Sequence, residues 1–126
     1  DWVIEHEART DKDAPLGLKT GVAGLDMIYG NRGIGKTDMV VIGARPKVGK
    51  TQLLVMILDH IAKYSGKAVL IFSMEMPKVQ LFERFLTNGS KVKGDSFYRE
   101  MDEYEWSMVS KSIGEMIGTK ILDAPT

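Results

Sequence analysis

The sequence predicts an α/β fold, with a parallel sheet covered by helices on both faces. Short apolar segments alternate with longer segments of helical periodicity, which favours parallel strands joined by right-handed helical crossovers. A motif typical of phosphate-binding loops lies between the first expected core strand and the helix that follows it. Only three core strands are expected, which is few for a sheet covered on both faces, so the chain is interpreted as part of a larger domain.

The first residues are expected to form an arm. Residues 1–16 show no sustained periodicity and contain Pro15 close to their end, so they are interpreted as a linker with one helical turn. Thr20 is expected to cap a short helix that ends near Tyr29. Residues 30–37 are interpreted as a glycine-rich turn that leads into the first core strand, residues 39–43.

The next elements follow the same alternation. Residues 51–64 are apolar nearly all round and precede Ser65-Gly66, which predicts a buried helix, and residues 68–73 predict a strand. Pro77 is expected to begin a helix that ends at Gly89. Its predicted apolar face consists of Val79, Phe82, Phe85 and Leu86.

The last expected elements are one helix and one strand. Asp102 and Glu105 have the spacing of a capping box and predict a helix that ends at Gly118. Its predicted apolar stripe consists of Trp106, Val109, Ile113, Met116 and Ile117. Residues 120–123 predict a short final strand.

Two segments are similar to the phosphate-loop pattern G-x-x-x-x-G-K-[ST]. Residues 30–37 match it fully, whereas residues 44–51 have Ala44 at the first position. Such a loop leaves a buried strand and enters a helix whose N-terminal N–H groups face the phosphates. Only residues 44–51 have these flanking elements, so this loop is the expected nucleotide site and residues 30–37 are not.

The nucleotide site is expected to comprise Ala44, Arg45, Pro46, Lys47, Val48, Gly49, Lys50, Thr51 and Gln52. Ala44 can replace glycine if the backbone there is ordinary, and Pro46 stiffens the loop. Lys50 would reach the β and γ phosphates, and the Thr51 hydroxyl would complete a Mg²⁺ shell. The alternative for Lys50 is a solvated side chain at a helix start, where the helix dipole disfavours a cation.

Two acidic residues follow expected strands. Glu75 lies at the carboxyl edge of the sheet, where a carboxylate could orient an attacking water and accept its proton. Its position leaves open the alternative that Glu75 caps the following helix. Asp123 could be an acid that ends a core strand near the metal, but only Ile121 and Leu122 provide the apolar run before it.

Composition excludes several classes of protein. No apolar run approaches the length of a membrane span, and the polar, acidic first residues do not resemble a signal peptide. The absence of cysteine excludes disulfides and thiolate metal sites and favours a cytoplasmic setting. The formal net charge is zero, and the excess of basic residues in the middle of the chain supports nucleic-acid binding only weakly.

Three motifs occur together in this order: GLKTG at residues 17–21 with Leu25-Asp26, ARPKVGKT at residues 44–51, and FSMEM at residues 72–76. As a set they resemble the RecA-like motor domain of DnaB-type replicative helicases, which has A-R-P-x-M-G-K-T and F-S-L-E-M at these places. The resemblance covers nearly all of the chain after Pro15. It implies a RecA-like P-loop NTPase fold, with residues 17–126 as the N-terminal half of the motor domain.

The resemblance also implies an ATP hydrolase and DNA helicase. Gly49, Lys50 and Thr51 would bind ATP and Mg²⁺, Glu75 would be the catalytic glutamate, and Asp123 would precede the family's Walker-B acid. A homo-hexamer would encircle one strand of single-stranded or forked DNA and move 5′ to 3′, with primase and a helicase loader as candidate partners and no membrane contact. The sequence departs from the family at residues 35–37, where a proline-glycine turn is usual.

The Walker-B strand, DNA-binding loops and arginine finger of the family are expected beyond Thr126, so the chain alone is expected to be inactive. Two other functions stay open. One is a RecA-like ATPase that binds or remodels DNA without unwinding it, as a RadA-like or KaiC-like relative would. The other is a non-catalytic fragment that binds nucleotide and partner subunits.

Overall fold

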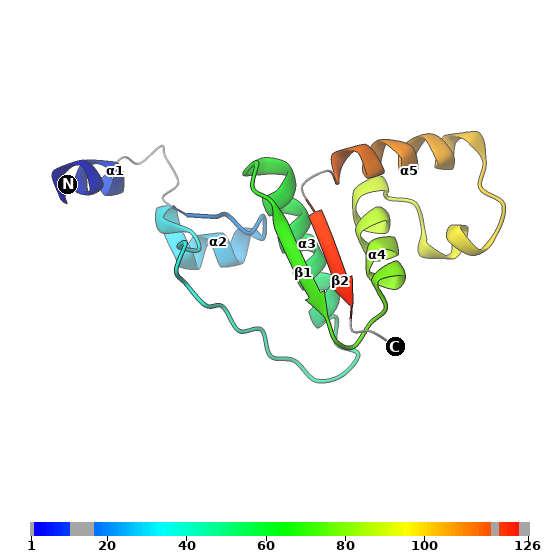
Figure 1. Ribbon diagram of the computed structural model, residues 1–126, viewed down its shortest axis with the longest axis horizontal. Coiled ribbons are helices and arrows are strands. Elements are labelled where there is room, and N and C mark those ends of the chain that lie inside the picture. Colours follow the sequence, from blue (N-terminus) through cyan, green and yellow to red (C-terminus); the bar gives the residue numbers. More distant parts are fainter. Residues whose placement is uncertain (1, 11–16, 117–118, 124–126) are drawn as a thin grey trace. The chain divides into compact units, whose positions relative to one another are not determined.

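The computed structural model describes residues 2–10, 17–116 and 119–123. The chain divides into two compact units, one up to Lys50 and one from Thr51 onward. Figure 1 shows that the first unit is helical and irregular, whereas the second combines helices with two adjacent strands.

The first unit contains α1 (Trp2–Thr10), α2 (Ala23–Tyr29) and the short 3₁₀ helix η1 (Gly30–Arg32). α1 is longer than the single turn predicted for the arm. The N-cap of α2 is Val22, without a side-chain hydrogen bond, so the prediction that Thr20 caps this helix is wrong. The Thr20 hydroxyl is used in the preceding loop instead, where it donates to Asp26 Oδ1 over 2.7 Å.

Asp26 organises this loop from within the helix. Its carboxylate also accepts the backbone N–H groups of Thr20, at 2.8 Å, and of Gly21, at 3.1 Å. Burial raises the pKa of Asp26, but the hydrogen bonds from Thr20 and Gly21 outweigh this effect and leave the pKa below its ordinary value. The carboxylate therefore serves the loop as its common acceptor.

Residues 30–37 form a turn, as predicted. Leu18 and Ile34 exchange backbone hydrogen bonds of 2.8 and 2.9 Å in an isolated antiparallel bridge. Gly33 is buried with a φ of 61°, and a Cβ at this position would lie 2.8 Å from the Leu18 carbonyl oxygen. Glycine is required here because both the φ angle and the close backbone contact exclude a side chain.

The strand predicted at residues 39–43 is not formed. The segment pairs with no other strand in the described part of the chain, and Met39 and Val41 are 89% and 78% exposed. A strand exists only where a neighbour accepts and donates its backbone hydrogen bonds, and an apolar run of this kind is typical of a strand with neighbours on both sides. The sequence pattern is therefore present without the partners that it needs.

The second unit contains α3 (Lys50–Tyr64), β1 (Val69–Ser73), α4 (Lys78–Ser90), the 3₁₀ helix η2 (Gly94–Tyr98), α5 (Glu103–Glu115) and β2 (Thr119–Asp123). β1 and β2 pair in parallel, with Val69 opposite Thr119 and Ser73 opposite Asp123. The predicted α/β class with a parallel sheet is confirmed for part of a domain. Two strands are present in the described residues where three were expected.

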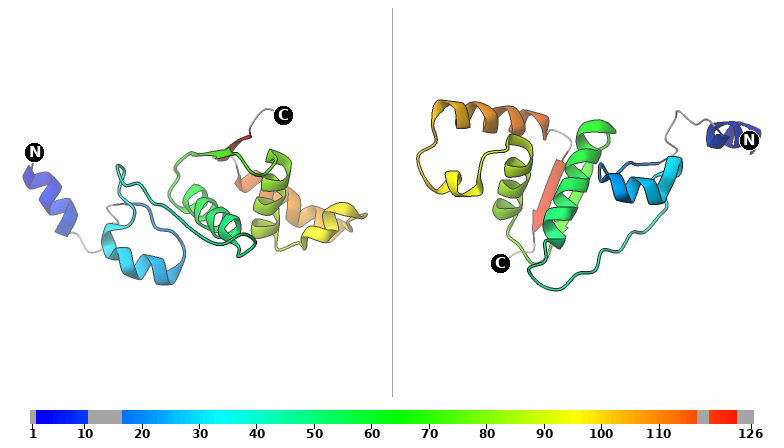
Figure 2. Two further views of the ribbon diagram at one scale, coloured as in Figure 1. Left: turned by 90° about the horizontal axis from the view of Figure 1, so that it is seen from below. Right: turned by 180° about the vertical axis from the view of Figure 1, so that it is seen from behind.

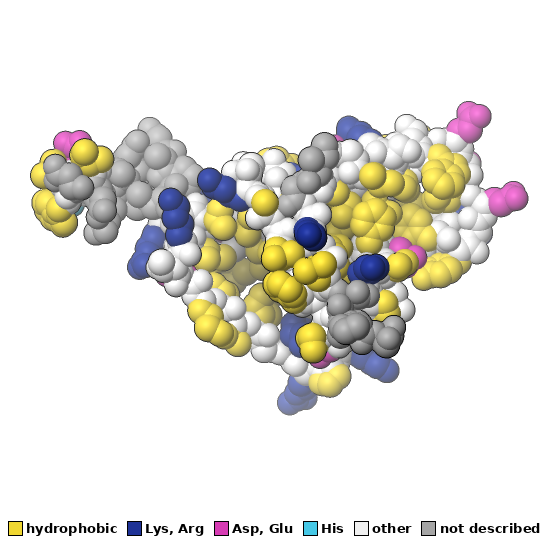
Figure 3. All heavy atoms as spheres, in the orientation of Figure 1, with side chains coloured by type: hydrophobic (Ala, Val, Ile, Leu, Met, Phe, Trp, Pro, Cys, Tyr) yellow, Lys and Arg dark blue, Asp and Glu magenta, His cyan; other side chains and the backbone are white. Residues whose placement is uncertain are grey.

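The helices on either side of β1 in the sequence, α3 and α4, lie on the same face of this small sheet (Figure 2). Val69 and Ile71 are buried on that face, whereas Leu70 and Phe72 on the other face are 53% and 71% exposed. Figure 3 shows hydrophobic side chains gathered around the strands. The second helical layer that was expected on the open face is not formed by the described residues.

The helices of the second unit agree with the predictions except in detail. α4 begins after Pro77, which is its N-cap, and continues through Gly89 to Ser90 before Lys91 ends it with a φ of 62°. Its buried apolar residues are Leu81, Phe85 and Leu86, whereas Val79 and Phe82 of the predicted apolar face are exposed. The buried face of α4 therefore follows residues 81, 85 and 86.

α5 begins with the predicted capping box. Asp102 accepts the Glu105 N–H over 2.7 Å, and the Glu105 side chain accepts the Asp102 N–H. Of the predicted stripe, Val109 and Met116 are buried, whereas Trp106 and Ile113 are about half exposed. The helix ends at Glu115, before the expected Gly118, and both Gly118 and Ile117 lie outside the described residues.

Candidate nucleotide site

Residues 44–50 form a tight loop that leads directly into α3. Pro46 and Lys47 form a turn, and the helix begins at Lys50. The φ angle is 63° at Lys47 and 104° at Gly49, so the backbone enters the left-handed region twice within three residues. A non-glycine residue in this region costs on the order of 1 kcal/mol, and such strain is characteristic of ligand-binding loops.

Several features make this loop a suitable phosphate cradle. Among the described residues, no heavy atom lies within 4 Å of a Cβ built on Gly49. The first turn of α3 carries no acidic residue, so the positive end of the helix dipole is not neutralised by a side chain. Ala44 does not have a positive φ, which agrees with the argument that alanine can replace glycine at this position.

The predicted side chains differ in exposure. Lys50 and residues 44–49 are exposed, whereas Thr51 and Gln52 are half-buried on the first turn of α3. An exposed lysine and a half-buried hydroxyl, on consecutive residues at a helix start, are the donor set that a nucleotide phosphate with Mg²⁺ requires. The residues of this loop therefore fit the expected cofactors ATP and Mg²⁺.

The loop that matches the spelled motif better, residues 30–37, has a different geometry. The Asp38 carboxylate accepts the Gly35 N–H over 2.8 Å and lies 3.8 Å from the Arg32 guanidinium. The Asp38 carboxylate thus already accepts the Gly35 N–H, a backbone donor that a bound phosphate would need. Lys36 and Thr37 form an exposed turn, which continues into an extended segment and not into a helix. This geometry does not suit phosphate binding.

Glu75 lies in the turn after β1 and its side chain is exposed. α3 runs antiparallel to β1, so the first turn of α3 and the carboxyl end of β1 lie at the same end of the second unit (Figure 1). Thr51 and Glu75 are consequently at the same edge of this unit. Asp123 is paired with Ser73 in the backbone register.

Ser73, which no sequence motif singled out, organises the turn that carries Glu75. Its hydroxyl donates to the Met76 carbonyl oxygen over 2.6 Å and accepts the Met76 N–H over 3.3 Å. A serine at the end of an apolar run, two residues before an acidic residue, is a signal for such a turn, because serine hydroxyls bond to nearby backbone groups.

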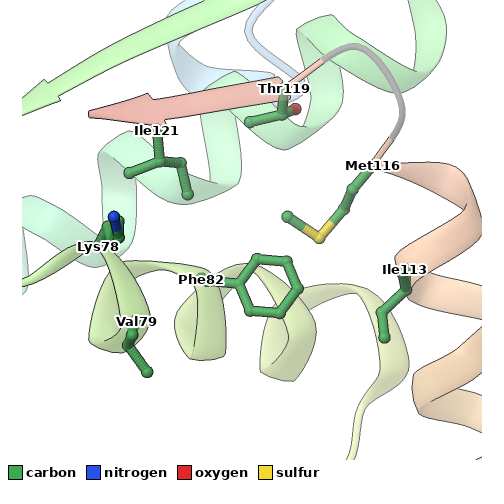
Figure 4. Close-up of a pocket in the computed structure, with 7 residues that line it drawn as sticks. All are labelled: Lys78, Val79, Phe82, Ile113, Met116, Thr119 and Ile121. Carbon is green, nitrogen blue, oxygen red and sulfur yellow. The ribbon is translucent and has the colours of Figure 1, made fainter.

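A separate apolar groove lies in the second unit, between α4, α5 and β2 (Figure 4). Its volume is about 450 Å³. The lining residues are Lys78, Val79, Phe82, Ile113, Met116, Thr119 and Ile121. This lining contains one charged side chain and no acid, so the groove lacks the groups that phosphate chemistry needs.

The described residues provide neither a cluster of metal-binding side chains nor a helix that could span a membrane. No group of three or more histidine, cysteine, aspartate or glutamate side chains is arranged to hold a metal ion there. This does not argue against Mg²⁺ at Thr51, since Mg²⁺ is commonly held by one or two protein ligands together with substrate phosphates. In the same residues, no helix is both long enough and apolar enough to cross a bilayer.

Known proteins show clear similarity to this chain. The family described as DnaB-like helicase C terminal domain matches residues 17–124. The replicative DNA helicase DnaB of Haemophilus influenzae is 31% identical over 100 residues, which are 78% of this chain and 21% of that protein. The DnaB of Treponema pallidum is 30% identical over 125 residues, or 97% of this chain and 28% of that protein.

Solved structures show the same fold. A DnaB-like replicative helicase, described together with its interactions with primase, has a TM-score of 0.81 at 22% identity and covers 98% of this chain and 31% of its own. A second solved structure, described as an ATPase domain, has a TM-score of 0.81 at 24% identity and covers 97% of this chain and 43% of its own. The chain thus spans about a quarter of the length of its curated relatives.

Proposed function

Because the chain belongs to the family of DnaB-like helicase C-terminal domains, we propose that it supplies the ATP-binding part of a replicative DNA helicase motor. The observation that carries this proposal is the strained loop at Lys47 and Gly49 that enters α3 at Lys50. Residues 1–16 serve as an arm before the domain, and residues 17–126 form the N-terminal half of the motor domain.

ATP is held by residues 44–52 in this proposal. The N–H groups of the loop and of the first turn of α3 donate to the phosphate oxygens. Lys50 neutralises the β and γ phosphates as a point charge, and the Thr51 hydroxyl completes the shell of the metal. Mg²⁺, when bound, neutralises charge that develops on the phosphate oxygens.

Glu75 is the general base of the proposed reaction. Its carboxylate is exposed and lies at the same edge of the second unit as the first turn of α3, from where it accepts the proton of the attacking water. General-base catalysis contributes roughly 10²–10⁴-fold to a rate. Removing the carboxylate should therefore reduce turnover and leave the phosphate contacts of Lys50 and Thr51 in place.

Hydrolysis drives movement along DNA in the whole protein. We propose a homo-hexameric ring that encircles single-stranded DNA at a fork, moves 5′ to 3′ and separates the duplex in the cytoplasm. Primase and a helicase loader are its candidate partners, and the primase interaction named for a structural neighbour supports the first of these. The groups that contact DNA belong to other parts of the protein, in agreement with the weak charge signal of this chain.

The test uses the full-length protein on forked DNA. ATP-dependent strand displacement, with a requirement for a free 5′ single-stranded arm, would support the proposal. DNA-stimulated ATPase activity without displacement would replace it with a RecA-like ATPase that binds or remodels DNA. ATP binding without any turnover, in the presence of forked DNA, would show a non-catalytic nucleotide-binding protein.

A further inference from the structure

The turn between β1 and α4 carries the Glu75 carboxylate, and a single hydroxyl holds this turn together. We propose that Ser73 is a positioning residue for Glu75, acting by tying the two ends of the turn. The inference rests on the proposed function, because it takes Glu75 as the general base. It adds a residue on which the rate of hydrolysis depends although it does not touch the substrate.

The hydrogen bonds of Ser73 close the turn. Its Oγ donates to the Met76 carbonyl oxygen at 2.6 Å and accepts the Met76 N–H at 3.3 Å. A hydroxyl is a small group that can both donate and accept, so it satisfies both backbone groups of Met76 at once. Glu75 lies between the two tied residues, and its backbone position is fixed by this pair of bonds.

Both ends of the turn are anchored on regular elements. Ser73 is the last residue of β1, paired opposite Asp123 of β2. On the other side, Pro77 caps α4 with a φ of −58°, and its carbonyl oxygen accepts the Leu81 N–H over 3.2 Å. The conformation between these anchors is therefore set by the Ser73 hydroxyl and by the fixed angle of the proline ring.

Packing contributes little to holding the turn. The Met74 side chain is 82% exposed, and the Glu75 side chain is exposed as well. Met76 is half-buried, but no side chain of the turn is fully buried, so the Ser73 hydrogen bonds and the proline ring are its main constraints. Loss of the Ser73 hydroxyl should consequently allow the Glu75 backbone to sample other conformations while β1 and α4 remain formed.

Catalytic carboxylates must be held within about 0.5 Å of their productive position. A displacement of roughly 1 Å can reduce a rate by about 10²-fold. Partial mobility of Glu75 should therefore lower kcat by on the order of 10-fold. The affinity for ATP should not change, because Ser73 lies outside residues 44–52, which bind the nucleotide in the proposed function.

The experiment measures kcat, KM and the Kd for ATP on the full-length protein with single-stranded DNA. The variants are Ser73→Ala, Ser73→Thr, Glu75→Gln, and Ser73→Ala combined with Glu75→Gln. Ser65→Ala is the matched control, because Ser65 also donates its hydroxyl to a backbone carbonyl, that of Ile61 at the end of α3, but lies at the opposite end of β1 from Glu75.

We expect Ser73→Ala to lower kcat about 10-fold at unchanged Kd, and Ser73→Thr, which keeps the hydroxyl, to restore most of the rate. In the Glu75→Gln background, Ser73→Ala should have no further effect, because the group that it positions is gone. Normal turnover in Ser73→Ala beside a slow Glu75→Gln would overturn this inference alone, as would equal losses in both backgrounds. Normal turnover in Glu75→Gln would overturn the base assignment and this inference with it.

Discussion

Asn88 on α4 donates a 2.7 Å hydrogen bond to the carboxylate of Asp59 on α3, 29 residues earlier in the chain. Asp59 is only 5% exposed, and the same carboxylate oxygen accepts the Lys63 ammonium at 2.9 Å. The Lys63 ammonium also lies 3.5 Å from a carboxylate oxygen of Glu115 on α5. A polar network centred on the buried Asp59 therefore connects α3 with α4 and α5.

Asp59→Ala should destabilise the second unit strongly. Breaking a buried ion pair by removing one partner costs roughly 3–5 kcal/mol, because the other charge stays buried without compensation. Here the remaining charge is Lys63, whose side chain is 16% exposed and would keep only the partly exposed Glu115 as an acidic partner, so we expect a loss at the lower end of this range. Urea denaturation of the variant checks this, with Asp95→Ala as the control, since Asp95 is an exposed acid of the same unit. An equal midpoint for the two variants would show that the network contributes nothing.

The two lysines of the phosphate-loop patterns should behave differently. Lys50→Ala should abolish ATP binding or hydrolysis, because Lys50 begins α3 beside the strained loop. Lys36→Ala should leave both nearly unchanged, because the Gly35 N–H next to it is already bonded to Asp38. Titration of both variants with ATP decides between the loops. A loss of binding confined to Lys36→Ala would contradict the assignment of the site.

Gly89 of α4 and Ser112 of α5 lie in close contact. A Cβ on Gly89 would collide with the Ser112 Oγ and lie 3.1 Å from the Lys63 Nζ. The Ser112 Oγ is buried and has no hydrogen-bond partner among the described residues. This contact explains why a glycine lies inside α4, although Gly89 was predicted to end the helix.

Ser112→Ala should therefore stabilise the protein, because an unsatisfied buried hydroxyl costs about 1–3 kcal/mol. The single substitution Gly89→Ala should destabilise the protein, because its Cβ would collide with the Ser112 hydroxyl. In the Ser112→Ala background this collision is removed, and alanine should stabilise the helix by up to about 1 kcal/mol relative to glycine. Thermal unfolding of the two single variants and the double variant gives the coupling. Additive effects would mean that the two residues do not meet.

The hydrogen bonds to the Glu105 carboxylate predict that the stability of the protein depends on pH. The Arg99 guanidinium donates to Glu105 at 2.7 and 3.1 Å, Ser96 donates at 2.9 Å, and these bonds hold the pKa of Glu105 below its ordinary value of 4.5. The carboxylate therefore stabilises the fold at pH values above 4.5, and this contribution is lost as the pH falls through the lower pKa of the folded state.

Glu105→Gln should thus reduce stability at neutral pH and make it less sensitive to pH below 4.5. Glu103→Gln is the control, because Glu103 is an exposed acid in the same turn of α5. Denaturant midpoints measured from pH 7 down to pH 3 test this. Parallel curves for the two variants would contradict it.

The elements that could be predicted from the sequence are those with local signals. The capping box of Asp102 and Glu105, the stop at Gly66 and the apolar run of β1 each depend on neighbouring residues, and each is found in the structure. The flanks of residues 44–51 favoured this loop over the better-spelled residues 30–37; of these flanks the helix that begins at Lys50 is present, whereas the strand at residues 39–43 is not formed in the described part of the chain.

What could not be predicted depends on contacts distant in sequence. The bond from Asn88 to Asp59 and the contact of Gly89 with Ser112 join different helices, and one sequence gives no sign of such pairs. The exposure of Phe82 and Trp106 could not be predicted for the same reason. An apolar pattern shows which face of a helix tends to be buried, but not which other element covers it. The Ser73 bonds are local, yet serine also occurs at solvated strand ends.

The last prediction concerns residues 39–43, which are apolar but unpaired in this structure. Val41 is 78% exposed here, although an apolar run of this kind is typical of a strand buried between neighbours. We expect this segment to become a central strand in the full-length protein, where further strands are available to pair with it. Val41→Asp should then disrupt ATP binding, because burying a carboxylate without a partner costs several kcal/mol and the segment leads directly into the nucleotide loop.

In the isolated chain of residues 1–126, the same substitution should leave the unfolding midpoint unchanged, since the side chain is already in water. Met74→Asp is the control in both contexts, because Met74 is 82% exposed and follows a strand that is formed. ATP titrations and urea denaturation of the two variants, each in the full-length protein and in the isolated chain, give the comparison. A Val41→Asp variant of the full-length protein that binds ATP normally would show that residues 39–43 stay in solvent, and the nucleotide loop would then lack the buried strand on which its assignment depends.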